Sequence, residues 1–183
     1  MSIEILVLQI LDKMPTIKSW TKKFWSQIFL IMLTCRGRHN FTNLARYSSL
    51  DEATIRNQFA KPFDFLSFNN HLINSLESEE RIIAFDPSYL PKSGKHTAGI
   101  GKFWSGCEGI AKKGLEICGF ASVGLESKTA MHLIAMQTIK KEGQTLNDLY
   151  ISLPKQYSKQ LHETSNVPVA DSYFSNYKYV SWH

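Results

Sequence analysis

The hydrophobic pattern of this chain changes its period near residue 80, and that change limits the folds open to it. Before that point apolar residues recur at helical spacing, as Phe24, Ile28 and Ile31 do within one segment. After it, short apolar runs alternate with glycine-rich and polar segments, which is typical of strands. The sequence therefore predicts a helical domain over residues 1–80 and a sheet-containing domain over residues 81–183.

The same periods predict the individual elements. In the first domain we expect helices at residues 3–12, 20–35, 41–47, from 51 onward and at 63–77. In the second we expect strands at 81–86, 115–123, 129–138 and 166–170, with helices after Thr145 and at 172–179. The short segment 124–128 predicts an antiparallel hairpin, and Pro154 is expected to kink or split the helix that Thr145 caps. The fold class is α/β in the broad sense and α+β more narrowly: a helical domain, then a mixed sheet with flanking helices.

Two acids stand at the ends of predicted strands. Asp86 follows the first of these strands and Asp171 follows the fourth. Two carboxylates on neighbouring strand ends can share a divalent cation, and Mg²⁺ and Mn²⁺ prefer hard oxygen ligands. Taken singly, each acid has a simpler interpretation, since Asp-Pro starts turns and Asp-Ser can cap a helix. Taken together, they indicate a metal site.

A basic stretch follows the first acid. The net charge of the chain is +5, and residues 81–114 hold six Lys or Arg against two Asp or Glu. A basic patch beside an acid favours an anionic partner, nucleic acid above all, although a solvated lysine-rich loop has the same composition. The candidate contacts to DNA phosphates are Lys92, Lys95, His96 and Lys102.

The helices expected at 41–47 and from 51 are joined by a tight turn, as in a helix-turn-helix unit. Any small helical bundle can give the same pattern, so the interpretation stays open. The residues expected to contact DNA from this unit are Arg38, Arg46, Arg56 and Asn57.

Several other classes of protein receive no support. The three cysteines have neither CxxC spacing nor the even number of a disulfide framework, which fits a reducing cytosol. The apolar run at 24–35 is shorter than the ~20 residues of a membrane span, and the first residues lack a signal-peptide pattern. The segment 94–102 departs from a P-loop because Ile100 stands where the lysine belongs.

Three stretches together resemble a known family: FDPSYLPKSGKHTAGIGKFWSGC, KKGLEICGFASV and PVADSYFSNYKYV. They are similar to bacterial insertion-sequence transposases of the DDE type, which have an RNase H-like catalytic core. The resemblance implies that Asp86 and Asp171 are catalytic and coordinate Mg²⁺ or Mn²⁺, and that the helical part binds the ends of the transposon. It also implies double-stranded DNA as partner and a bacterial, nucleoid-associated cytoplasmic location.

The chain departs from the family in one respect. The family's third acid, a Glu on a late helix, comes after a fifth strand, and the chain stops at His183 before either. None of the later glutamates stands in the required place: Glu108, Glu116, Glu126, Glu142 and Glu163. The resemblance therefore predicts the front portion of a transposase, incomplete for catalysis and with an exposed strand edge.

Two hypotheses and a third reading follow. In the first, the chain takes part in cleavage and strand transfer at transposon ends by two-metal phosphodiester chemistry, with Asp86 and Asp171 holding the ions. In the second, it is a non-catalytic, regulatory protein that binds DNA. In the second case it would form homo-oligomers or pair with the full-length transposase. A decayed product without activity is the third reading.

Overall fold

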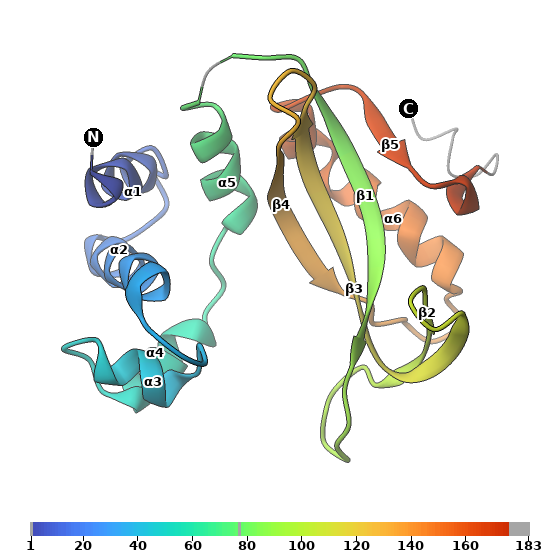
Figure 1. Ribbon diagram of the computed structural model, residues 1–183, viewed down its shortest axis with the longest axis horizontal. Helices are drawn as coiled ribbons and strands as arrows, with labels where there is room; N and C mark the ends of the chain where they lie inside the picture. The colour runs from blue at the N-terminus through green and yellow to red at the C-terminus, as the bar shows by residue number, and fades with distance from the viewer. Residues whose placement is uncertain (1, 77, 176–183) are drawn as a thin grey trace. The chain divides into compact units, whose positions relative to one another are not determined.

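The computed structural model describes residues 2–76 and 78–175, and the chain divides into two compact units, Met1–Leu72 and Ile73–His183 (Figure 1). The division comes before the expected boundary at residue 80 because the acidic segment there is bound to the second unit: Glu79 accepts hydrogen bonds from Ser127. We call the first part the helical unit and the second the sheet unit.

This boundary changes how the charge is shared. Residues 1–72 contain nine Lys or Arg and five Asp or Glu, a difference of +4, whereas residues 73–183 contain twelve and eleven, a difference of +1. The helical unit therefore carries most of the net positive charge of the chain. The basic stretch at 81–114 belongs to the sheet unit, where the other acids nearly balance its charge.

The helical unit contains five helices in its described residues: α1 Ile3–Asp12, α2 Ser19–Thr34, α3 Phe41–Arg46, α4 Glu52–Phe59 and α5 Phe65–Ile73. Four of them begin at residues whose side chains accept a hydrogen bond from a backbone N–H of the first turn: Ser2, Asn40, Asp51 and Asp64. Such caps satisfy backbone groups that would otherwise lack partners, and each typically contributes about 1 kcal/mol.

Trp25 lies at the centre of the core of the helical unit. Its ring lies 4.5 to 5.5 Å from five other aromatic rings, centroid to centroid: Phe24, Phe29, Phe59, Phe63 and Phe65. Aliphatic side chains from α1, α2 and α4 complete the cluster: Ile10, Leu11, Ile28 and Ile55 are at most 1% exposed. The helical periodicity of the sequence is thus satisfied by one shared core.

The sheet unit is a mixed sheet with one long helix, so the fold is α+β. Its elements are β1 Arg81–Pro91, β2 Gly101–Ser105, β3 Ile110–Gly124, β4 Ala130–Gln137, α6 Leu146–His162, β5 Pro168–Ala170 and the 3₁₀ turn η1 Ser172–Phe174. The strands run in the order β2-β3-β1-β5, and β4 also pairs with β3. Strand β5 is parallel to β1 and lies at the edge of the described sheet, whereas the other pairings are antiparallel.

Helix α6 connects β4 to β5 and covers one face of the sheet (Figure 1). Its Tyr150 ring lies 6.3 Å from that of Phe85 on β1, and Phe85 in turn lies 4.8 Å from Phe120 on β3. A capping box of Thr145 and Asp148 starts the helix, which confirms the predicted N-cap. The helix then continues through the buried Pro154, so the predicted split does not occur.

Two predictions about the strands and one about a helix require correction. Strand β1 does not end at Asp86 but continues to Pro91, because β3 pairs with it along its whole length. The sequence pattern missed β2 and the first residues of β3, which form a separate hairpin. The helix expected at 172–179 begins as the short turn η1, and its residues 176–179 lie outside the described part.

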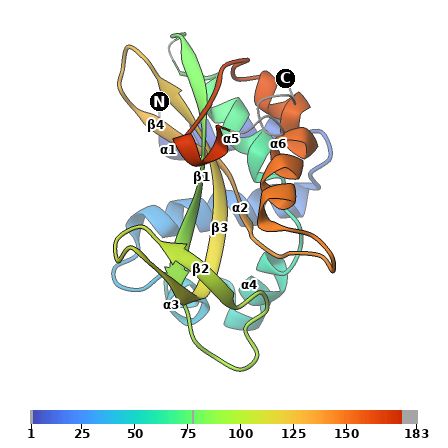
Figure 2. The same ribbon diagram turned by 90° about the vertical axis from the view of Figure 1, so that its right-hand side faces the viewer.

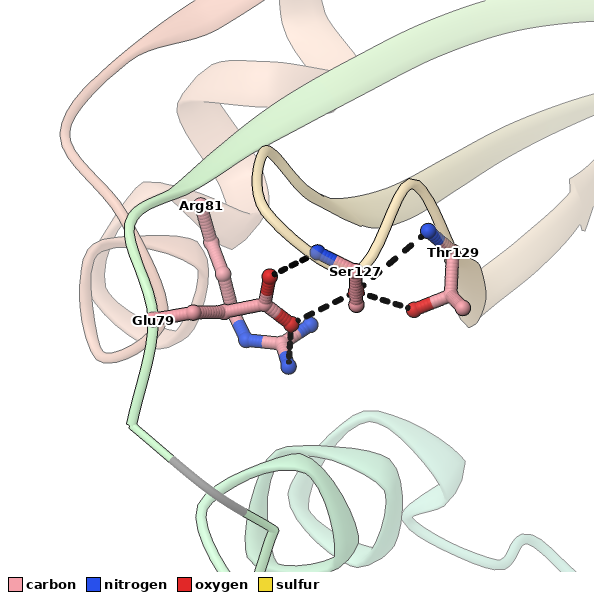
Figure 3. A network of polar contacts seen from close by, with 4 residues as sticks. All are labelled: Glu79, Arg81, Ser127 and Thr129. Carbon is pink, nitrogen blue, oxygen red and sulfur yellow. Dashed lines mark hydrogen bonds and ion pairs between the residues drawn. The ribbon is translucent and has the colours of Figure 1, made fainter.

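A network of polar side chains ties the start of β1 to the turn between β3 and β4 (Figure 3). The Glu79 carboxylate accepts hydrogen bonds from Arg81 Nη2 at 2.6 Å and from the backbone N and side-chain Oγ of Ser127 at 2.9 and 2.8 Å. The side chains of Glu79 and Arg81 are only 9% and 8% exposed. The donated hydrogen bonds of Ser127, more than the charge of Arg81, hold the pKa of Glu79 below its ordinary value.

Gly124 is adjacent to this network, and a Cβ atom at that position would collide with the Glu79 carboxylate. The Gly124→Ala substitution is therefore expected to lower the urea midpoint of the sheet unit, because Glu79 must leave its hydrogen bonds. Gly119→Ala on the same strand is the matched control, since its Cβ would lie at ordinary distances, 3.7 and 3.8 Å, from its neighbours.

Unfolding of both variants can be followed by circular dichroism. In a Glu79→Ala background the effect of Gly124→Ala should shrink, because the colliding group is gone. Equal effects of Gly124→Ala and Gly119→Ala would contradict this account of the network.

Candidate functional site

The pairing of β1 with β5 brings the two predicted acids together. The paired residues are Ile83 with Pro168, Ala84 with Val169 and Phe85 with Ala170. The next residue along each strand is Asp86 on β1 and Asp171 just after β5. Parallel pairing in this register therefore places the two carboxylates at adjacent positions on neighbouring strands.

The electrostatics of Asp86 reflect this arrangement. Its pKa is raised above the ordinary value of 3.8, first by the partial loss of water around the carboxyl and also by the negative charge of Asp171. A hydrogen bond of 3.4 Å donated by Ser88 Oγ acts in the opposite direction. The folded chain thus holds two like charges close together, an arrangement that favours a bound cation or proton.

Asp171 also has the local role that its sequence context suggested. Its Oδ1 accepts a hydrogen bond from the backbone N–H of Tyr173 at 2.9 Å and so caps η1. The cap fixes the orientation of the carboxylate relative to the sheet. Capping and metal binding are compatible, because a carboxylate has two oxygens and several lone pairs.

Both acids line a cleft of about 420 Å³. Its walls come from β1, β2, β3 and α6, all labelled in Figure 2, and from the segment after β5. The lining residues are Asp86, Pro87, Lys102, Phe103, Trp104, Glu116, Leu146, Tyr150, Asp171, Tyr173 and Phe174.

Glu116 is a third acid of this cleft, although it does not stand where the family resemblance requires a catalytic glutamate. It is 5% exposed, and its Oε1 accepts hydrogen bonds from Tyr150 at 2.7 Å and from Thr138 at 2.9 Å. One signal could have identified it: a charged residue at an inward position of the alternating β3 pattern needs partners inside the protein. Those partners come from α6 and from the residue after β4, so the sequence alone could not identify them.

The hydroxyl groups around Glu116 are held in their neutral, donating forms. Burial and the hydrogen bond to Glu116 raise the pKa of the Tyr150 hydroxyl far above its ordinary value. Burial likewise raises the pKa of the Cys118 thiol to about 11, and its Sγ lies 3.2 Å from Thr138 Oγ1. The cleft is therefore backed by a fixed layer of polar side chains, which consists of Tyr150, Thr138 and Cys118.

The donor set can be compared with what a divalent cation needs. Two adjacent carboxylates supply the hard oxygen ligands that Mg²⁺ and Mn²⁺ prefer, and water or phosphate oxygens can fill the remaining positions. Among residues 2–76 and 78–175, no group of three His, Cys, Asp or Glu side chains has the geometry of a metal site.

The basic residues predicted to contact DNA are distributed over three places. Lys102 on β2 lines the cleft. The exposed residues Lys92, Lys95 and His96 lie on the loop between β1 and β2 and are not part of the lining. That loop is anchored by a hydrogen bond of 2.7 Å from Gln137 Nε2 to the carbonyl oxygen of Ala98.

The other four predicted contacts belong to the helical unit: Arg38, Arg46, Arg56 and Asn57. All four are exposed, but Arg56 already has two partners. Its guanidinium forms an ion pair of 2.6 Å with Glu52 and lies 4.7 Å from the centre of the Phe41 ring.

Comparison with known proteins gave no match to a family model, a curated protein or a solved structure. Among the described helices, none has both the length and the apolar character needed to cross a membrane.

Replacing Asp86 by Asn is expected to raise the free energy of unfolding at neutral pH, because the folded state disfavours the ionised carboxyl. A carboxyl whose pKa is raised on folding destabilises the protein above that raised pKa. The penalty is lost as the pH falls through the raised value towards 3.8. The gain in the free energy of unfolding that Asp86→Asn brings at neutral pH should therefore disappear in acid.

Urea unfolding at neutral and acid pH, without divalent ions, measures this difference. The control is Glu126→Gln, which removes an exposed carboxylate outside the cleft. An advantage of Asp86→Asn that persists unchanged in acid would show that its origin is not the charge.

Proposed function

We propose that the sheet unit is part of an RNase H-like catalytic domain and that the chain belongs to the machinery of DDE-type DNA transposition. The observation that carries the proposal is the register of β1 and β5, which sets Asp86 and Asp171 side by side at a cleft. The order of elements also supports it, since four antiparallel strands are followed by a helix that leads to a fifth strand parallel to β1.

In this proposal the reaction is cleavage of a phosphodiester bond and transfer of the strand at transposon ends. Asp86 and Asp171 hold a divalent cation, Mg²⁺ or Mn²⁺, which when bound stabilises negative charge on the phosphate oxygens. Lys102 meets a neighbouring phosphate at the wall of the cleft. Glu116 keeps the floor of the cleft negative and rigid through its two hydrogen bonds.

The partners follow from the same reading. Double-stranded DNA at the transposon ends is the substrate, with the nucleoid in the bacterial cytoplasm as the place of action. A second copy of the chain or a full-length transposase is the protein partner.

Where the chain nicks supercoiled plasmid DNA in Mg²⁺ without the family's third acid, the Asp86→Asn and Asp171→Asn variants are each expected to reduce that nicking to background, because each removes one of two charged ligands. Binding of Mn²⁺, measured by electron paramagnetic resonance, should fall in parallel. Glu126→Gln changes the charge equally outside the cleft and should leave both unchanged. Nicking that persists in Asp86→Asn would rule out the catalytic assignment.

A second candidate function is DNA binding without catalysis, and the charge of the helical unit favours it. This unit has a difference of +4 between basic and acidic residues. Helices α3 and α4 each begin at a side-chain cap, so the two short helices and their connection are well defined. Arg38 and Arg46 are exposed and form no ion pair within the described residues, so their charges are available to phosphates.

The salt dependence of duplex binding tests this second function. Arg38→Ala and Arg46→Ala should each lower the slope of log K against log salt by about one, because each removes a phosphate contact. Arg56→Ala should have a smaller effect because Glu52 already neutralises its charge. Lys159→Ala, an exposed cation on α6, is the control. Slopes that do not differ from that of the unmodified chain would exclude these contacts.

A further inference from the structure

Two large aromatic side chains are exposed at the cleft that holds the acids. Trp104 on β2 is 63% exposed and Tyr173 on η1 is 64% exposed, and both line the cleft with Asp86 and Asp171. Other rings of the sheet unit are buried in its core: Phe85, Phe103, Phe120, Tyr150 and Phe174. Two exposed rings at one cleft indicate a surface that contacts another molecule.

The position of Trp104 is fixed by the hairpin that carries it. Strand β2 pairs with β3 in a register that sets Trp104 opposite Ala111. Phe103 and Ser105, on either side of it, are buried and hold the backbone in place. The indole therefore stands in solvent on a rigid support, so little conformational entropy would be lost when a partner binds to its face.

The position of Tyr173 is fixed by the same cap that orients Asp171. Its backbone N–H donates to Asp171 Oδ1, and its ring lies 5.2 Å from Phe174 and 6.5 Å from Tyr150, both edge-on. The aromatic ring is thus coupled directly to one of the two acids, and a ligand stacked on it would lie beside the carboxylate.

The chemistry of the cleft indicates the kind of ligand. Flat apolar rings accept the faces of nucleobases, and stacking of this kind contributes ~1–3 kcal/mol per base with little sequence preference. Lys102, two residues before Trp104 on β2 and also in the lining, provides a positive charge for a phosphate. In an intact duplex the base faces are covered by their neighbours, so only unpaired nucleotides can use both rings.

We propose that the cleft binds an unpaired stretch of DNA, with bases stacked on Trp104 and Tyr173 and the backbone directed towards Asp86 and Asp171. This inference rests on the proposed function only in taking DNA as the polymer. It adds that the site acts on a frayed or single strand. The three acids repel phosphate, so binding should tighten when Mg²⁺ is present.

The test measures binding of a short oligothymidine, and of a blunt duplex of equal length, to the full chain in Mg²⁺ and in EDTA. Trp104→Ala should weaken single-strand binding by about fivefold or more, whereas Trp104→Phe should retain most of it. Ile110→Ala, which shortens a 54% exposed side chain of the same hairpin outside the cleft lining, is the matched control. Duplex binding should not change in Trp104→Ala.

Quenching of tryptophan fluorescence by the oligothymidine gives a second measurement, since the part of the quenching due to Trp104 must vanish in Trp104→Phe. Single-strand affinity that is equal in Trp104→Ala and the unmodified chain would overturn the inference. The metal-dependent nicking assay is independent of this result. Loss of nicking in Asp86→Asn, with unchanged single-strand affinity in Trp104→Ala, would support the proposed function alone. Weaker single-strand binding in Trp104→Ala, without loss of nicking in Asp86→Asn, would support the stacking site alone.

Discussion

The short parallel pairing between β1 and β5 is the constraint on which the candidate site depends. It consists of three residue pairs, and no hairpin could supply it, because parallel neighbours need a crossover. The crossover here is α6, whose Tyr150 and Leu153 pack into the same buried layer as Phe85 and Phe174. The carboxylates of Asp86 and Asp171 are thus brought together by apolar contacts formed behind them.

That arrangement has an electrostatic cost. Two like charges lie at adjacent positions, and a third acid, Glu116, lines the same cleft beneath them. The structure tolerates this because each acid has a compensating contact: Ser88 donates to Asp86, the Tyr173 backbone to Asp171, and Tyr150 with Thr138 to Glu116. Groups held in unfavourable charge states at a cleft are typical of sites that bind cations or perform chemistry.

The two units differ in net charge. The helical unit carries most of the net positive charge and is built around the ring of Trp25, whereas the sheet unit is almost neutral and has three of its eleven acids at one cleft. The boundary falls between Leu72 and Ile73, and Glu79 belongs to the sheet unit, where it accepts hydrogen bonds from the side chain and backbone of Ser127. In the function that we propose, the helical unit would bind the DNA backbone and the sheet unit would act on the phosphodiester.

The sequence by itself determined the helical first part, the antiparallel hairpin of β3 and β4, the cap at Thr145 and the two acids, because these depend on local periodicity and capping chemistry. Only the tertiary structure decided the rest. Pairing with β3 carried β1 past Asp86, since backbone partners override the weak strand preference of Asp and Pro. Glu116 joined the cleft only because α6 brought Tyr150 to it, and the cleft walls came from segments that no local pattern connects.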